Sequence, residues 1–442
     1  MSGGTAVVSK NSLNHRILAL AVPAIVANIT TPLLSLVDVA IVGRLGSAAF
    51  VAAIAVGGTM FNLLYWLFGF LRTGTSGLTA QAEGRGDERG SAITLARSLL
   101  LAMAFAATIM CLSRPLGNLL LNFIDPDEAT ADLAWRYFTI LIFGAPASLG
   151  YMALTGWFIG RQNTRATMWV SLLINVTNIA ASLLLVFVSG LGMIGVATGT
   201  LIAQWTGFIT ALIYAVRHYG VQVPPLSEII GGHGFRRFFS INSDIFLRTL
   251  CLIAVTLWFT RAGAKQGAVM LAVNTLLMQF FTLFSYFMDG FAFAGEALCG
   301  KAVGKGDGHE LTQAVRALMK YGMVMALLFT TLYFIGGDFL LNILTTDTNV
   351  LSAATEYSLW ALTIPAAGFM AFTWDGIFIG ATLTRFMLVS IAGATIVFFS
   401  IWWVLTPILG NHALWLAFIS YLFFRGLLQS LLWYRHHYSS NV

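Results

Sequence analysis

Long apolar stretches constrain the fold of this chain more than any other feature. A helix of about 20 apolar residues crosses the roughly 30 Å hydrocarbon core of a bilayer, and stretches of this length recur from Ile17 to Tyr434 with only short polar connections. Charged residues make up 10% of the 442 residues, against about a quarter in soluble domains. The sequence therefore predicts an all-α polytopic membrane protein with about twelve transmembrane helices, near residues 17–42, 49–73, 91–113, 133–157, 167–189, 193–216, 237–260, 268–293, 314–335, 352–379, 386–406 and 411–434.

The charged residues between the spans predict how the chain lies in the membrane. Residues 1–16 lack the apolar core and cleavage site of a secretory signal, so we expect the first span to remain in the mature protein. With the N-terminus in the cytoplasm, most basic residues fall on the cytoplasmic side and an acidic cluster around Asp125 and Asp127 falls on the other. The positive-inside rule thus puts both termini in the cytoplasm. We expect the protein to lie in the inner membrane. The net charge of +6 then needs no nucleic-acid partner, because the charges are spread over many loops.

A long internal repeat divides the chain into two halves. Gly156-Trp157-Phe158-Ile159-Gly160, followed by Thr164-Arg165, returns 220 residues later as Gly376-Ile377-Phe378-Ile379-Gly380, followed by Thr384-Arg385. The same shift carries Gly84-Arg85-Gly86-Asp87 onto Gly304-Lys305-Gly306-Asp307. A period this long indicates duplicated halves rather than a short-repeat solenoid.

The repeat also predicts the class of protein. Each half holds about six spans, an even number, so both halves start on the same side of the membrane. We predict two pseudo-symmetric six-helix lobes, an N-lobe over residues 1–217 and a C-lobe over residues 236–442, joined by a cytoplasmic linker over residues 218–235. Parallel repeats of this kind are typical of secondary transporters, which bind substrate and coupling ion near the midplane and move one bundle against the other.

Asp38 is the strongest candidate for a functional residue. It lies inside the first apolar span, where an ionised side chain costs about 3 kcal/mol on insertion scales. A similar shift, of 217 residues, superposes Arg44 on Arg261 and puts Val255 opposite Asp38, so the first half has an acid here that the second half lacks. Pro23 and Pro32 precede it in the same span, and each removes a backbone donor and tends to kink a helix. The span that carries Asp38 is therefore expected to be bent or bendable.

Polar side chains in the fifth span are the expected partners of Asp38. Asn175, Asn178 and Ser182 follow three-to-four spacing along one helical face, and Thr177 lies beside them in the sequence. These side chains could hydrogen-bond Asp38 across a bundle. The alternative is helix packing without a role in transport, since Asn, Ser and Thr are common at interfaces between membrane helices.

The second half carries a different set of charges. Asp244 and Arg248 have i, i+4 spacing and are predicted to pair, while Asp289 lies in the eighth span and Asp375 in the tenth. Buried charges of this kind form either a structural ion-pair network or part of a gate, and the sequence leaves both open. Glu296, near the end of the eighth span, is expected to be solvated.

The sequence patterns that could indicate an enzyme are incomplete. Gly295-x-x-x-x-Gly300-Lys301 resembles a phosphate loop, but Ala302 stands where a magnesium-binding Ser or Thr belongs and no strand precedes it. The seven histidines lie in loops or at span ends without metal-ligand spacing, and the three cysteines form no recognisable pair. We expect no catalysis, no cofactor and no metal.

Several motifs together resemble the multidrug and toxic compound extrusion (MATE) family, and in particular its DinF branch. The resemblance covers nearly the whole chain. It rests on Val22-Pro23, Asp38 and Gly43-Arg44-Leu45-Gly46; Phe70-Leu71-Arg72 and Gly77-Leu78-Thr79-Ala80-Gln81; Asp289-Gly290-Phe291-Ala292 with Glu296-Ala297; Asp375-Gly376-x-Phe378-Ile379-Gly380-Ala381; and Gly410-Asn411-His412-Ala413-Leu414-Trp415-Leu416-Ala417.

This resemblance implies export of amphipathic, often cationic, organic compounds in exchange for protons or sodium ions. It also implies that the acid matching Asp38 couples the cation, that the proline matching Pro23 bends the first helix, and that the Asn matching Asn178 belongs to the same polar cluster. One departure is informative, because many relatives have an Asp where this chain has Ser182. Without that hard anionic ligand a sodium site is less favoured, whereas burial lets a lone carboxyl bind and release a proton near neutral pH. We therefore expect proton antiport.

Other interpretations stay open at this stage. A sodium-coupled antiporter of the same family, or a lipid-linked oligosaccharide flippase of the same superfamily, would share the duplicated plan. A flippase would be expected to have a cationic central cavity, for which Arg248 is the main candidate. The expected partners are small organic molecules and the lipid bilayer. Gly195-x-x-x-Gly199 permits close helix contact within one bundle as easily as between subunits, and we expect a monomer.

Overall fold

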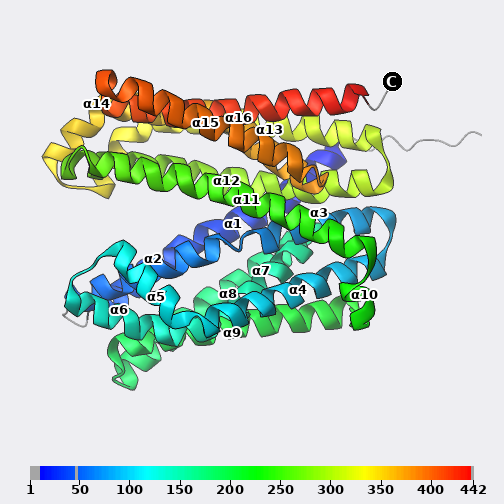
Figure 1. Cartoon of the computed structure of the whole chain (residues 1–442), viewed down its shortest axis with the longest axis horizontal. Coiled ribbons are helices and arrows are strands. Elements are labelled where there is room, and N and C mark those ends of the chain that lie inside the picture. The colour runs from blue at the N-terminus through cyan, green and yellow to red at the C-terminus, as the bar shows by residue number, and fades with distance from the viewer. Residues whose placement is uncertain (1–9, 45–47, 440–442) are drawn as a thin grey trace, which may run out of the picture. The chain divides into compact units, whose positions relative to one another are not determined.

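The computed structural model describes residues 10–44 and 48–439, so Leu45 and Gly46 of the first motif lie outside the described residues. The described chain consists of helices and their connections, without a strand. Twelve helices or helix pairs in it are long and apolar enough to cross a membrane, which confirms the predicted all-α polytopic fold (Figure 1). Three of these spans consist of more than one element: α2 (Ala48–Trp66) with α3 (Phe70–Arg85); α6 (Glu128–Leu141) with η1 (Ile142–Gly144) and α7 (Ala145–Gly160); and α8 (Thr164–Leu183) with η2 (Leu184–Val188).

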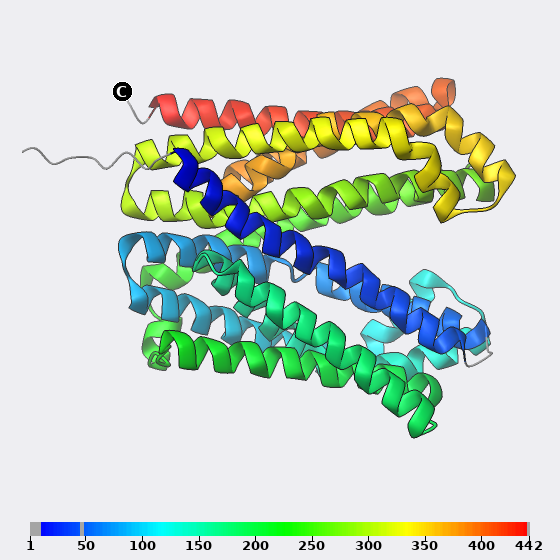
Figure 2. The ribbon, with the colours of Figure 1, turned by 180° about the vertical axis from the view of Figure 1, so that it is seen from behind.

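The chain forms two compact units, which are described separately. The N-unit is Pro23–Asn242, and the C-unit comprises the described parts of Met1–Val22 and Ser243–Val442. Both boundaries fall inside helices, in α1 (Lys10–Gly43) and α11 (Gly232–Ala264). Figure 2 shows α1 in dark blue as one continuous helix. The lobes 1–217 and 236–442 and the linker 218–235 remain a prediction.

The remaining helices of each unit follow the chain order. In the N-unit they are α4 (Glu88–Cys111), α5 (Ser113–Ile124), α8 (Thr164–Leu183) with the π-helical turn η2 (Leu184–Val188), α9 (Gly192–Tyr219) and α10 (Leu226–Ile230). In the C-unit they are α12 (Ala268–Lys305), α13 (Gly308–Leu344), α14 (Thr348–Gly380), α15 (Thr384–Leu409) and α16 (Asn411–Ser439). Within the C-unit, α12 packs along α14, and α15 along α16.

The repeated sequence motifs have the same structural role in each unit. Gly86 and Gly306 have φ of 69° and 71°, a left-handed conformation that glycine adopts without strain and that ends α3 and α12. The following residue, Asp87 or Asp307, accepts hydrogen bonds from the first backbone N–H groups of the next helix. The Gly-x-Gly-Asp repeat is therefore a tight turn between consecutive spans.

The second repeated motif brings two helices into close contact. A Cβ added at Gly156 would lie 2.1 Å from the carbonyl oxygen of Arg72, and one at Gly376 would lie 2.2 Å from that of Ala292. In the N-unit α7 thus packs directly on the backbone of α3, and in the C-unit α14 packs on α12 in the same way. Only glycine permits such an approach.

Candidate functional site

Asp38 is a buried carboxylate in the second half of α1. Its residue surface is 7% exposed, and its Oδ1 atom has no hydrogen-bond partner among the described residues. Buried polar atoms are nearly always hydrogen-bonded, and a buried acid with an oxygen that lacks a partner is a candidate for binding a proton or a cation. As predicted, Asp38 lies within an apolar helix, and the structure shows that its side chain is buried there.

Asn178 and Tyr137 lie beside this carboxyl. The side chain of Asn178, on α8, is within interaction range of Asp38, and the charge of Asp38 acts on the phenol of Tyr137, on α6. The Asn178 side chain is held in place, because its Nδ2 donates to Thr200 Oγ1 on α9 at 2.8 Å and its Oδ1 accepts from Ser182 Oγ at 3.4 Å. The structure thus groups Asn178 and Ser182 with Asp38.

Close packing of α9 on α8 fixes the position of Ser182. Ser182 is fully buried, and a Cβ added at Gly199 would lie 2.5 Å from its Oγ and 2.8 Å from its backbone nitrogen. A Cβ at Gly195 would meet the backbone of the π-helical turn η2 at 3.0 Å. The Gly195-x-x-x-Gly199 motif therefore serves contact between helices within the N-unit.

Asn175 contacts the helix of Asp38 but not the acid itself. Its Nδ2 donates to the carbonyl oxygen of Thr30 at 3.3 Å, on the segment of α1 between Pro23 and Pro32. Thr177 is half-buried on the same helix, and no described hydrogen bond joins it to Asp38. The helix α1 continues through both prolines, so its expected bending remains a prediction.

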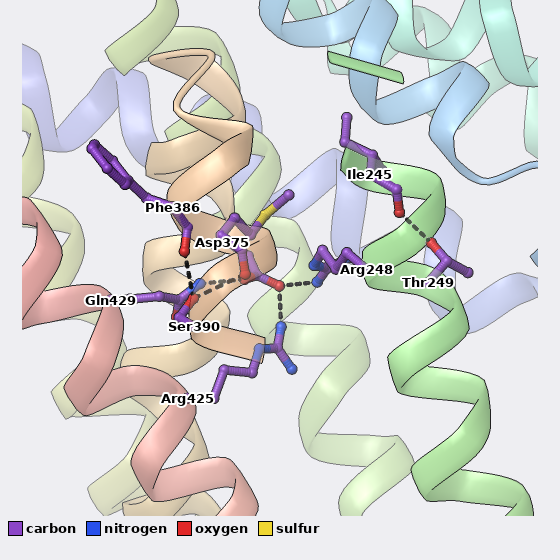
Figure 3. A network of polar contacts seen from close by, with 9 residues as sticks. Ile245, Arg248, Thr249, Asp375, Phe386, Ser390, Arg425 and Gln429 are labelled. Carbon is purple, nitrogen blue, oxygen red and sulfur yellow. Dashed lines mark hydrogen bonds and ion pairs between the residues drawn. The ribbon is translucent and has the colours of Figure 1, made fainter. Parts of the chain in front are cut away.

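The C-unit contains a second buried carboxylate with a complete set of partners. Asp375 on α14 is 6% exposed, and its Oδ2 accepts hydrogen bonds from Arg248 on α11 and from Arg425 on α16. Its Oδ1 accepts from Gln429 Nε2 at 2.8 Å (Figure 3). Three helices are joined at this point, and in contrast to Asp38 both oxygens of the acid are occupied.

The predicted pair of Asp244 and Arg248 is wrong. Arg248 forms its ion pair with Asp375, while Asp244 Oδ2 accepts a hydrogen bond from Thr384 on α15 at 2.9 Å. An i, i+4 spacing puts two side chains on one face of a helix. Here each of the two side chains instead bonds to a residue on a neighbouring helix. Asp289 on α12 lies near the Arg248–Asp375–Arg425 cluster, because its charge acts on Arg425.

The expectation that Glu296 is solvated is also wrong. Only 1% of its surface is exposed.

Four residues of these clusters were missed by the sequence reasoning: Tyr137, Thr200, Arg425 and Gln429. Arg425 carried a usable signal, because it is a charged residue inside the last apolar span, the same property that identified Asp38. Tyr137, Thr200 and Gln429 are uncharged, and only their neighbours in the fold show that they belong to these clusters. Among the described residues there is no group of three or more His, Cys, Asp or Glu that could hold a metal ion.

Comparison with known proteins assigns the chain to a family. The MatE family model matches residues 23–184 and 244–404, one stretch in each half. This chain belongs to the MATE family. Members of this family are transporters and not enzymes, which confirms both the resemblance and the expectation of no catalysis.

Relatives of this MATE protein are found in bacteria. DNA damage-inducible protein F of Escherichia coli K12 is 37% identical over 424 residues, which is 94% of this chain and 91% of the relative. A probable multidrug resistance protein NorM of Deinococcus radiodurans is 29% identical over 73% of this chain and 71% of its own length. The Edwardsiella ictaluri multidrug resistance protein MdtK is 23% identical and covers 91% of each chain.

Solved structures agree on the fold. The MATE transporter VcmN of Vibrio cholerae in its bent form has a TM-score of 0.85 and 15% identity, with 98% of each chain covered. A MOP superfamily transporter of Pyrococcus furiosus has a TM-score of 0.83 and 17% identity, covering 97% of this chain and 96% of its own. The twelve-helix arrangement of this MATE protein is therefore shared with experimentally determined transporters.

Proposed function

We propose that this chain exports amphipathic organic compounds, cationic ones among them, in exchange for protons that bind at Asp38. The transporter is expected to lie in the inner membrane with both termini in the cytoplasm, and to work by alternating access. The observation that carries the proposal is the Asp38 carboxyl, buried beside Asn178 with an oxygen that has no hydrogen-bond partner among the described residues.

The surroundings of Asp38 favour a proton over sodium. A carboxyl that binds a proton becomes neutral, which removes the cost of a buried charge and requires no further ligand. A metal cation instead needs a shell of several oxygen ligands, preferably including a second carboxylate. Ser182 offers a hydroxyl at the position where a second acid would stand, and this hydroxyl is already bonded to Asn178.

Proteoliposomes with imposed ion gradients test this proposal. We expect a pH gradient to drive efflux of a fluorescent organic cation, a sodium gradient to have no effect, and Asp38→Asn to abolish pH-driven efflux. Asp38→Glu should retain part of the activity because it keeps the acid, and Asp132→Asn, which alters an exposed acid on α6, should transport normally. Efflux that follows sodium and ignores pH, or full activity in Asp38→Asn, would contradict the proposal.

A further inference from the structure

The arginine cluster of the C-unit contains buried hydrogen-bond donors that have no acceptor. Both Arg248 and Arg425 contact Asp375 through Nη2, and the Nε atom of each is buried without a partner among the described residues. The hydroxyl of Tyr421, on α16, is also buried without a partner, and the charges of both arginines act on it. Buried donors that lack an acceptor are costly and therefore rare in folded proteins.

The acids of this region do not use these donors. Asp375 has both oxygens occupied, and Asp289 is near enough for its charge to act on Arg425 but accepts none of the hydrogen bonds described for the two arginines. The two acids can balance the charge of the two guanidinium groups, yet the Nε donors remain unsatisfied. The guanidinium of Arg425 also lies over the ring of Phe372, 5.8 Å from its centroid, which holds the group in place without using its N–H donors.

The fold itself does not require this cluster. Under the 220-residue repeat, Arg425 corresponds to Trp205 and Asp375 to Thr155 in the N-unit. The N-unit therefore forms its equivalent helices without an arginine or an acid at these places. An arginine and an acid that are buried at these places in only one of two homologous units point to a role other than packing.

We propose that Arg248, Arg425 and Tyr421 form a binding site for a small monoanionic group, either a carboxylate on an organic molecule or a halide ion. A guanidinium group binds such an anion through parallel N–H donors, and a phenol adds a third donor. The side chain of Arg248 is 12% exposed and that of Arg425 is 4% exposed, so the anion enters beside Arg248. None of these residues belongs to the Asp38 cluster. If the ligand is a carboxylate, the transporter would also accept substrates that carry an acid group.

Equilibrium binding to the purified full-length protein in lipid nanodiscs tests this site without any transport assay, so the result is independent of the proposed proton antiport. Benzoate is the probe, titrated by calorimetry in a buffer of low salt. We expect one benzoate per chain, and a loss of affinity on the order of tenfold to a hundredfold in Arg425→Gln, as for loss of a hydrogen bond to a charged group. Arg435→Gln, an exposed arginine on the same helix, is the matched control and should bind benzoate normally.

The variant Asp375→Asn tests whether the arginine cluster is a binding site or only a structural ion-pair network. Removing the carboxylate frees the Nη2 donors of both arginines, so the proposal predicts tighter benzoate binding and a protein that benzoate stabilises against heat. The double variant Arg425→Gln/Asp375→Asn should lose this gain, and it keeps the buried charges balanced if Arg425→Gln alone fails to fold.

Competition with chloride identifies the kind of anion. Displacement of benzoate by chloride would assign the site to halide ions, and no displacement would assign it to organic carboxylates. Absence of benzoate binding in both the wild type and Asp375→Asn, or equal binding in Arg425→Gln, would overturn the proposal.

Discussion

The hydroxyl of Thr200 determines how the Asn178 amide is presented to Asp38. An amide side chain can rotate so that its nitrogen and oxygen exchange places, and its neighbours decide which orientation is kept. Here Thr200 accepts from Nδ2 and Ser182 donates to Oδ1, so both ends of the Asn178 amide have a defined partner. The orientation of the Asn178 amide beside Asp38 is thus set by its hydrogen bonds to Thr200 and Ser182.

Replacing Thr200 by Val tests this arrangement at the level of one residue. The two side chains have nearly the same shape, but valine leaves the buried Asn178 amide without its acceptor, a loss of about 1–3 kcal/mol. We expect pH-driven efflux to fall several-fold while the protein still folds. Thr198→Val is the control, because the hydroxyl of Thr198 on the same helix bonds only to Ile194. Equal efflux rates in the two variants would show that the orientation of Asn178 does not matter.

At the scale of helices, contact between α8 and α9 depends on a glycine. Gly199→Ala would bring a Cβ to within 2.5 Å of Ser182 Oγ, so the helices must move apart or Ser182 must shift. Overpacking of this kind costs about 1–3 kcal/mol. We expect a lower thermal unfolding temperature and slower efflux in Gly199→Ala, measured on the purified and reconstituted protein.

Gly58→Ala is the matched control for this contact. Gly58 lies in α2, and a Cβ added there meets no atom within 4 Å. Alanine should stabilise the helix slightly, by about 0.5–1 kcal/mol, because it restricts the unfolded chain. If both variants unfold at the same temperature, the close approach at Gly199 is not a constraint on stability.

The short helix α10 is fixed to α4 by Arg97. Its guanidinium donates to the carbonyl oxygens of Ile229, Glu228 and Gly231, at 2.8, 3.0 and 3.3 Å, and so satisfies the C-terminal end of a helix of only five residues. By contrast, Arg89 pairs with the Glu228 side chain at the surface, where 69% of the arginine side chain is exposed. Exposed ion pairs contribute little to stability.

Limited proteolysis distinguishes these two arginines. Arg97→Ala leaves three carbonyl groups without a donor, so we expect chymotrypsin to cleave after Leu226 several times faster than in the wild type. Arg89→Ala should change the rate little. Faster cleavage in Arg89→Ala than in Arg97→Ala would show that the surface pair, and not the carbonyl contacts, holds α10.

At the scale of the whole molecule, the buried acids Asp38 and Asp375 differ in how many of their carboxylate oxygens have hydrogen-bond partners. Within the part of the chain that the structure describes, Asp38 has an oxygen without a hydrogen-bond partner, while Asp375 is bonded to two arginines and a glutamine. Only one of the two therefore has a free position for a proton. If the proposed antiport is right, we expect one proton for each exported molecule.

This stoichiometry predicts how efflux responds to membrane potential. One inward proton gains about 2.3 kcal/mol per 100 mV, and export of a singly charged cation cancels this gain while export of a neutral molecule does not. In proteoliposomes with a potassium diffusion potential and equal pH on both sides, efflux of a neutral substrate should respond to voltage and efflux of a monovalent cation should not. Voltage-driven efflux of a monovalent cation would require more than one proton.

The sequence by itself determined the membrane class, the twelve spans, the duplicated halves and the position of an acid, Asp38, inside an apolar span. These properties depend on hydropathy and on local composition, because a bilayer excludes charges and requires helices of a certain length. The family followed from motifs that are contiguous in the chain, and its match to residues 23–184 and 244–404 agrees with the internal repeat.

The tertiary structure decided which polar groups meet. Helical spacing put Asp244 and Arg248 on one face, but Arg248 bonds to Asp375, and Asn175 bonds to the backbone of α1 instead of to Asp38. Partners of this kind lie on helices far apart in the sequence, and the packing of these helices sets the distance between them. Hydrogen bonds act over about 3 Å, so the choice between neighbouring partners depends on packing, which a single sequence does not contain.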